Sequence, residues 1–246
     1  MKGESMKKLN LLPLAVVLTL AVTARAQQQT AINLGSAGTY AVLAATTVTN
    51  TGFSIINGNL GVWPGTAITG FGPGVVNGTE DAGDVAAHHA EASLTIAYDD
   101  AAARTAVHIG SLSGDISGLT LAPGLYKSTS ALSLSGTLTL HGSGVYIIQI
   151  TSALTVGNGA AVVLSGGATA ADVFWQVGSS ATLGTTAQFK GTIMAFTSIS
   201  LATGAVLEGR ALASNGAVTL QGNDVTIPLA KGVLLYVPPV TPPSHD

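Results

Sequence analysis

Short blocks of alternating apolar and small polar residues recur through the second half of the chain, each interrupted by glycine. Five blocks can be aligned on a central apolar residue: Leu134, Val156, Leu183, Leu201 and Leu220. The intervals between them are 22, 27, 18 and 19 residues. A constant strand–glycine–strand–glycine order with variable spacing is typical of a parallel β-solenoid, whose corners tolerate insertions. Residues 47–58 resemble a further coil near the N-terminus.

Several coils also contain a strand that is apolar at almost every position. Examples are residues 145–150, 173–177 and 193–196. When both faces of a strand are apolar, both must be covered. One face would point into the solenoid, and the other needs a covering element.

Residues 82–106 are predicted to form that cover as the one long helix of the chain. The segment has no proline and no glycine after Gly83, and Leu94 and Tyr98 lie at helical spacing. Thr79 or Asp81 would cap its start. At 1.5 Å per residue the helix would be about 37 Å long, enough to run along six coils stacked over about 29 Å. We expect Leu94 and Tyr98 to be buried against the apolar strands, near Tyr146, Trp175 and Met194.

The remaining surface divides into two faces. One points Leu140, Phe189 and Leu207 inward and exposes charged residues such as Lys190. On the other, the five aligned apolar residues point inward, so strict alternation sends their neighbours outward. None of these neighbours is charged, and all except Gln221 are small. The residue in the middle of each block is Ser or Thr. The outward residues predicted to form this face are Thr47, Thr49, Thr51, Ala131, Ser133, Ser135, Ala153, Thr155, Ser180, Thr182, Ser198, Ser200, Ala217 and Thr219. A face of this kind, free of charge and of the helix, suits a flat and repetitive partner.

Composition and charge narrow the class of protein. Residues 1–26 have the positive start, apolar centre and Ala24-Arg25-Ala26 ending of a secretory signal peptide, which predicts a secreted product cleaved after Ala26. The remaining chain would carry five basic and eleven acidic side chains, a balance that excludes binding to a nucleic-acid backbone. No later apolar run is long enough to span a membrane. Cysteine is absent, so disulfides and thiol chemistry are excluded.

Neither a catalytic centre nor a metal or cofactor site is predicted. The densest group of potential ligands, His88-His89-Ala90-Glu91, lacks the H-E-x-x-H spacing and is interpreted as a solvated helix surface. Asp99 and Asp100 are neighbours on the helix and do not face each other. The glycine-rich turns lack the order of a phosphate-binding loop.

Several motifs in a fixed order resemble the microbial ice-binding proteins of the discontinuous β-solenoid type. They are Leu34-Gly35 followed by Tyr40-Ala41-Val42-Leu43-Ala44, residues 58–65 (GNLGVWPG), residues 68–72 (ITGFG), residues 119–126 (LTLAPGLY), residues 173–177 (VFWQV) and residues 209–213 (GRALA). The resemblance covers about residues 34–228. It implies a mostly β fold, a right-handed, discontinuous, three-faced parallel β-solenoid (β-helix) with one long flanking helix. It also implies secretion by a cold-adapted microbe and antifreeze activity, seen as thermal hysteresis and ice recrystallisation inhibition, located on one flat face.

The family has no strict ice-binding consensus, so the assignment of the face rests on the alternation described above. Strand rows every 4.7–4.9 Å lie close to the spacing of oxygen rows in ice. We therefore expect the partner of this monomeric protein to be an ice surface. The expected organisation is a signal peptide (1–26), a solenoid domain (27–228) without a large capping subdomain, and a proline-rich tail (229–246).

Two alternatives stay open. A cell-envelope adhesin or polysaccharide-binding β-solenoid would share the fold, although a glycan-binding face usually exposes aromatic residues. A solenoid polysaccharide lyase would need clustered charged groups for calcium binding or proton abstraction, and the charges here are dispersed.

Overall fold

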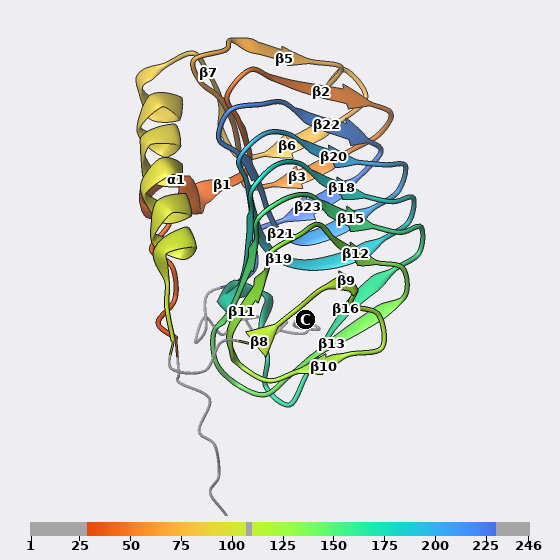
Figure 1. The fold of residues 1–246 in the computed structure, drawn as a ribbon. Helices are drawn as coiled ribbons and strands as arrows, with labels where there is room; N and C mark the ends of the chain where they lie inside the picture. The colour runs from red at the N-terminus through yellow and green to blue at the C-terminus, as the bar shows by residue number, and fades with distance from the viewer. Residues whose placement is uncertain (1–28, 107–109, 230–246) are drawn as a thin grey trace, which may run out of the picture.

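The computed structural model describes residues 29–106 and 110–229, which form two parallel β-sheets and one α-helix. The strands are stacked as the coils of a solenoid, and the helix lies along one side of the stack (Figure 1). The predicted signal peptide and nearly all of the predicted tail lie outside the described residues. Within the described residues, no helix is long and apolar enough to cross a membrane.

The smaller sheet has eight strands and forms one complete face of the solenoid. Figure 1 shows its strands stacked from β5 at the top to β9 near the bottom. In spatial order they are β5 (Ala67–Thr69), β2 (Thr47–Thr51), β22 (Val218–Gln221), β20 (Ile199–Leu201), β18 (Ala181–Leu183), β15 (Leu154–Val156), β12 (Leu132–Leu134) and β9 (Gly114–Asp115).

The larger sheet has fifteen strands and supplies the other two faces. These faces are continuous because β19 (Gln188–Ala195) and β21 (Val206–Ala213) turn the corner between them, at Gly191 paired with Gly209. The helix-side face also contains β8 (Gly110–Ser111), β11 (Gly124–Ser128), β14 (Tyr146–Ile150), β17 (Val173–Val177), β1 (Tyr40–Ala44), β4 (Asn59–Val62) and β7 (Glu80–Ala82). The third face also contains β10 (Thr120–Leu121), β13 (Thr137–His141), β16 (Ala161–Ser165), β23 (Asp224–Thr226), β3 (Ile55–Asn57) and β6 (Val75–Asn77). Two 3-10 turns, η1 (Gly35–Thr39) and η2 (Ala170–Asp172), lie outside the sheets.

The stack is discontinuous in sequence, as the resemblance implied. The N-terminal strands β1, β2 and β3 pair with β21, β22 and β23, which come from the other end of the chain. The N-terminal strands therefore lie between the last coil and the strands β4, β5 and β6 that follow them in sequence. Residues between Phe71 and the helix add only β6 and β7, so no large capping subdomain is present there.

The helix α1 (Val85–Ala103) is shorter than predicted and starts later. Residues 80–82 belong to β7, which pairs with β4, and Gly83 turns the chain with φ of 69°. The N-cap is Asp84, whose carboxylate accepts a hydrogen bond from the Ala87 amide at 2.9 Å, so neither Thr79 nor Asp81 has that role. Nineteen residues give a helix about 28 Å long, against about 34 Å for the eight stacked strands. The helix thus covers most of the stack rather than its full length.

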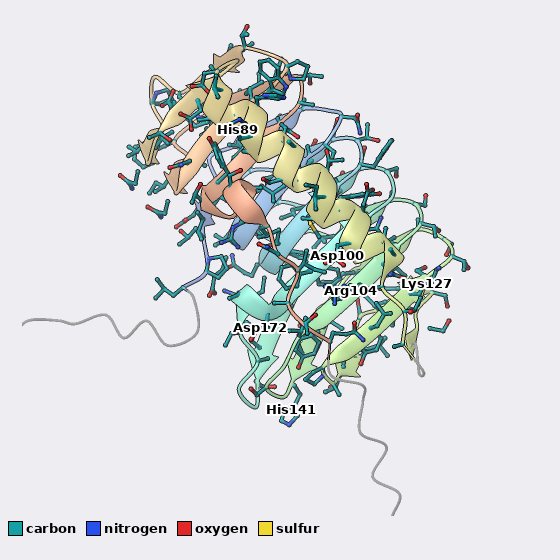
Figure 2. All side chains as sticks on the ribbon, turned by 90° about the vertical axis from the view of Figure 1, so that its left-hand side faces the viewer. His89, Asp100, Arg104, Lys127, His141 and Asp172 are labelled. Carbon is teal, nitrogen blue, oxygen red and sulfur yellow. The ribbon has the colours of Figure 1, made fainter. Side chains whose placement is uncertain are left out.

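Two apolar cores lie on opposite sides of the helix-side face. The inner core fills the space between the three faces, and the second lies beneath α1, which crosses the outer surface of the strands in Figure 2. Leu94 is fully buried in the second core together with Met194, as predicted. Tyr98 is only half-buried, and Tyr146 and Trp175 point into the inner core instead. The prediction that Tyr146 and Trp175 lie beneath the helix was therefore wrong. Successive residues of a strand point to opposite faces, and their neighbours Ile147 and Phe174 take the helix-facing positions.

Candidate functional site

The inward side of the eight-stranded sheet follows the predicted alternation. The aligned apolar residues are all at most 1% exposed: Leu134, Val156, Leu183, Leu201 and Leu220. Their neighbours two positions earlier are also buried: Leu132, Leu154, Ala181, Ile199 and Val218. Apolar side chains thus anchor β12, β15, β18, β20 and β22 to the inner core, and the residues between them must point outward.

The middle outward residues form a single column in register. Direct Cα pairings join neighbouring members in the order Thr69, Thr49, Thr219, Ser200, Thr182, Thr155, Ser133 and Asp115. The predicted column is therefore continuous, and the N-terminal coil joins it through Thr49. The structure adds Thr69 at one end and Asp115 at the other, neither of which the sequence analysis included.

Two flanking columns run beside the middle one. On one side, backbone hydrogen bonds of 3.0–3.1 Å join each coil to the next. The amides of Leu132, Leu154, Ala181 and Ile199 donate to the carbonyl oxygens of Ala153, Ser180, Ser198 and Ala217 respectively. The column on this side contains Ala131, Ala153, Ser180, Ser198, Ala217 and Thr47, and ends with Ala67, which pairs with Thr47. The other side contains Ser135, Gly157, Gly184, Ala202, Gln221 and Thr51. All predicted face residues are therefore brought together on one sheet.

The hydroxyl groups of the middle column are available to solvent. Within the described part of the chain, no Ser or Thr of this column has a protein hydrogen-bond partner for its side chain. The Thr members on β5, β2, β15 and β18 are exposed, and the other members are half-buried. Some flanking hydroxyls do have partners, such as Ser198 Oγ, which accepts from the Ala217 amide at 3.3 Å. The middle column thus presents regularly spaced methyl and hydroxyl groups to water.

Asp115 places a charge at the β9 end of this face, so the prediction of an entirely uncharged face was wrong. Its carboxylate accepts hydrogen bonds from the hydroxyls and the amides of Ser117 and Ser135. These donors hold the pKa of Asp115 well below its usual range, with the Ser117 hydroxyl making the largest contribution. The residue ties together the last two coils of the sheet and remains ionised.

The third face carries the solvated charges expected of it. Lys190 Nζ lies 2.8 Å from Glu208 Oε2, across the paired strands β19 and β21. His141 is exposed on β13, and its Nδ1 lies 3.1 Å from the Ser165 hydroxyl. Leu140, Phe189 and Leu207 are fully buried on the opposite side of these strands.

The helix offers little for catalysis or metal binding. Among the described residues, no three potential ligands are grouped closely enough to hold a metal ion. Asp100 forms an ion pair with Arg104 at 2.7 Å near the end of the helix, far from His89 at its beginning (Figure 2). Hydrogen bonding from Arg104 lowers the pKa of Asp100. His88 and His89 are exposed as predicted, but Glu91 is buried, which corrects the interpretation of that segment as wholly solvated.

Comparisons with known proteins agree with this architecture. A family model described as Ice-binding-like matches residues 42–226. An ice-binding protein of Nostoc sp. (strain HG1) is 43% identical over 219 residues, which is 87% of this chain and 80% of the relative. An ice-binding protein of Colwellia sp. is 36% identical, covering 89% of this chain and 92% of the relative.

Solved structures give the same result. The crystal structure of an ice-binding protein from an Antarctic biological consortium superposes with a TM-score of 0.82 and 53% identity, covering 83% of this chain and 95% of that one. The family match spans most of the chain, and the curated relatives are ice-binding proteins rather than enzymes. This chain therefore belongs to the ice-binding-like family.

Proposed function

We propose that this protein is secreted, after cleavage behind Ala26, and adsorbs to ice through the outward face of the eight-stranded sheet. The observation that carries the proposal is the in-register column of Ser and Thr from Thr69 to Ser133, whose hydroxyls have no protein partner. The rows of this column repeat at the strand spacing of about 4.8 Å. Water can therefore be ordered over the face in a pattern that merges with an ice surface.

The mechanism follows from the number of rows rather than from any single contact. Each methyl or hydroxyl binds a water layer weakly, but many contacts made in register leave a molecule that detaches very slowly. Ice growing between adsorbed molecules must curve outward, which lowers its local freezing point. The expected consequences are thermal hysteresis and inhibition of ice recrystallisation.

Substitution of Thr155 or Thr182 by Tyr tests the face directly. The bulky ring would hold neighbouring rows away from the lattice, so each variant should lose most of its thermal hysteresis. Both side chains are exposed, and the melting temperature of the fold should change little. Thermal hysteresis is measured on a single ice crystal in a solution of purified protein, with the recrystallisation assay beside it.

Lys190→Tyr is the matched control. Lys190 lies on the third face, and its ion pair with Glu208 is partly exposed and contributes little stability. The control should keep full ice activity. Loss of activity in the control together with retention in both Thr variants would show that another face binds ice.

A further inference from the structure

A cavity of about 250 Å³ lies at the corner between α1 and the eight-stranded sheet. Three separate parts of the fold line it: one side of α1, the connection from β4 to β5, and the connection from β21 to β22. From these come Glu91 and Ala92, Trp63, and Ser214 respectively. Ala92 is exposed and Trp63 is half-buried, so the cavity is open to solvent on that side.

The cavity contains two polar groups without partners. Glu91 is 7% exposed, and its Oε1 atom is buried without a hydrogen bond. Ser214 Oγ, from the facing connection, is also buried without a hydrogen bond. An ionised carboxylate in this position is costly because nothing compensates its charge. Burial accordingly raises the pKa of Glu91 from 4.5 to about 8.

When Glu91 is ionised, the described part of the chain supplies no counter-ion for it. No lysine or arginine is among the described residues that line the cavity. The described lining offers one carboxylate, the hydroxyls of Thr95 and Ser214 and the imidazole of His88, which are too few oxygens for a calcium ion because calcium takes six to eight. The other walls are the indole of Trp63 and small apolar surfaces such as Ala92, which favour an organic cation over a hydrated inorganic one.

We propose that this cavity binds a small alkylammonium cation, with the Glu91 carboxylate as its counter-ion and with Ser214 and the indole of Trp63 in contact with its alkyl groups. His88 packs against that indole, with ring centroids 4.7 Å apart and ring planes inclined by 46°, and restricts its movement. The site is separate from the outward columns of the eight-stranded sheet, and its function is therefore independent of ice adsorption.

Binding of the cation is coupled to release of a proton. The carboxylate must be ionised to hold the ligand, and among the described residues His88 is the only other titratable side chain lining the cavity. Neither the β4–β5 nor the β21–β22 connection contributes a titratable group to the lining. Asp84 lines a neighbouring cavity on the Trp63–His88 pair and adds negative charge on that side. With the pKa of Glu91 at about 8, the apparent affinity at pH 6 should be about a hundredfold weaker than at pH 9.

Titration of the full-length protein with tetramethylammonium chloride tests the site, with sodium chloride at equal ionic strength as the reference. Binding is followed by calorimetry and by tryptophan fluorescence. A change in fluorescence reports on Trp63, because the other tryptophan, Trp175, is fully buried in the inner core. We expect saturable binding of tetramethylammonium over sodium at pH 9 and the hundredfold loss at pH 6. Equal responses to the two salts at pH 9, or an affinity that does not change with pH, would overturn the proposal.

Two variants separate binding from folding. Glu91→Gln keeps the shape of the side chain and removes the charge, so it should fold and lose the binding. Ala92→Leu keeps Glu91 and costs little helix propensity, but its larger side chain fills the cavity and should also abolish binding. Circular dichroism and thermal hysteresis report whether each variant is folded. Binding by a folded Glu91→Gln variant with wild-type affinity would show that the carboxylate is not the recognition group.

Discussion

The buried carboxyl group of Glu91 makes a quantitative prediction about stability. In the folded protein this group holds its proton up to a pKa of about 8, because burial disfavours the charged form. In the unfolded chain it releases the proton near 4.5. Between these two pH values the folded state binds more protons than the unfolded state, so the free energy of unfolding falls as the pH rises. Below pH 4.5 the group contributes no pH dependence, and above pH 8 the full cost is present.

The size of this effect follows from the two pKa values. A rise from 4.5 to about 8, at about 1.4 kcal/mol for each unit of pKa, corresponds to about 5 kcal/mol. About 4 kcal/mol of this loss develops between pH 5 and pH 8.5, which should lower the melting temperature of a domain of this size by about 8–16 °C. Glu91→Gln should match the wild type at pH 5 and remain nearly constant up to pH 8.5. Asp100 and Asp115 do not mask the effect, because their lowered pKa values confine their contribution to acidic solution.

Urea unfolding followed by circular dichroism, in phosphate and borate buffers without amines, measures the free energy at each pH. Glu208→Gln is the control, since that side chain is partly exposed and paired with Lys190. The control should keep the wild-type decline. A wild type whose stability is constant from pH 5 to 8.5, or a Glu91→Gln variant that declines as steeply, would refute the burial argument.

Three further predictions concern the helix and the absence of a metal centre. Leu94→Ala should lower the free energy of unfolding by about 2–5 kcal/mol in urea unfolding, because Leu94 is fully buried beneath α1; a change below 1 kcal/mol would contradict that packing. Asp84→Ala should cost about 1 kcal/mol in the same assay, because the Ala87 amide loses its cap, whereas Thr79→Ala should not change the stability of the helix. Thermal hysteresis should survive EDTA, and its loss on chelation would reveal a metal site.

Much of the sheet carrying the proposed ice-binding face could be predicted because a strand has a side-chain period of two. Within each glycine-bounded block the apolar residues alternate with the small polar ones, so Val156 is predicted to point inward and Thr155 outward. A shift of the strand by one residue would expose every apolar side chain. The pairing of β2 with β22 could not be derived in this way. It joins segments about 170 residues apart, and local alternation contains no information about which coils become neighbours.

The missing members of the middle column lie in the shortest strands. Thr69 follows Ile68 in a three-residue strand, and Asp115 is the last residue of a two-residue strand and is followed by the buried Ile116. The repeated block is incomplete in both places, although each residue keeps the same alternation with an apolar neighbour. Glu91 was also misplaced, since the sequence analysis treated it as part of a polar cluster. Its spacing from Ala87 and Leu94, four and three residues, puts it on the buried stripe of the helix.

On the proposed function, the length of the uncharged column sets the strength of adsorption. Seven rows from Thr69 to Ser133 extend about 29 Å, and every row adds a weak contact only if it stays in register with the others. Asp115 ends this series, because an ionised carboxylate orders water around its charge rather than in the pattern of the lattice. The other two faces cannot extend it, since one is covered by α1 and the other carries the charged pair Lys190–Glu208. A longer ice-binding face would therefore need additional coils inserted between β12 and β5, where each new strand adds a row without a charge.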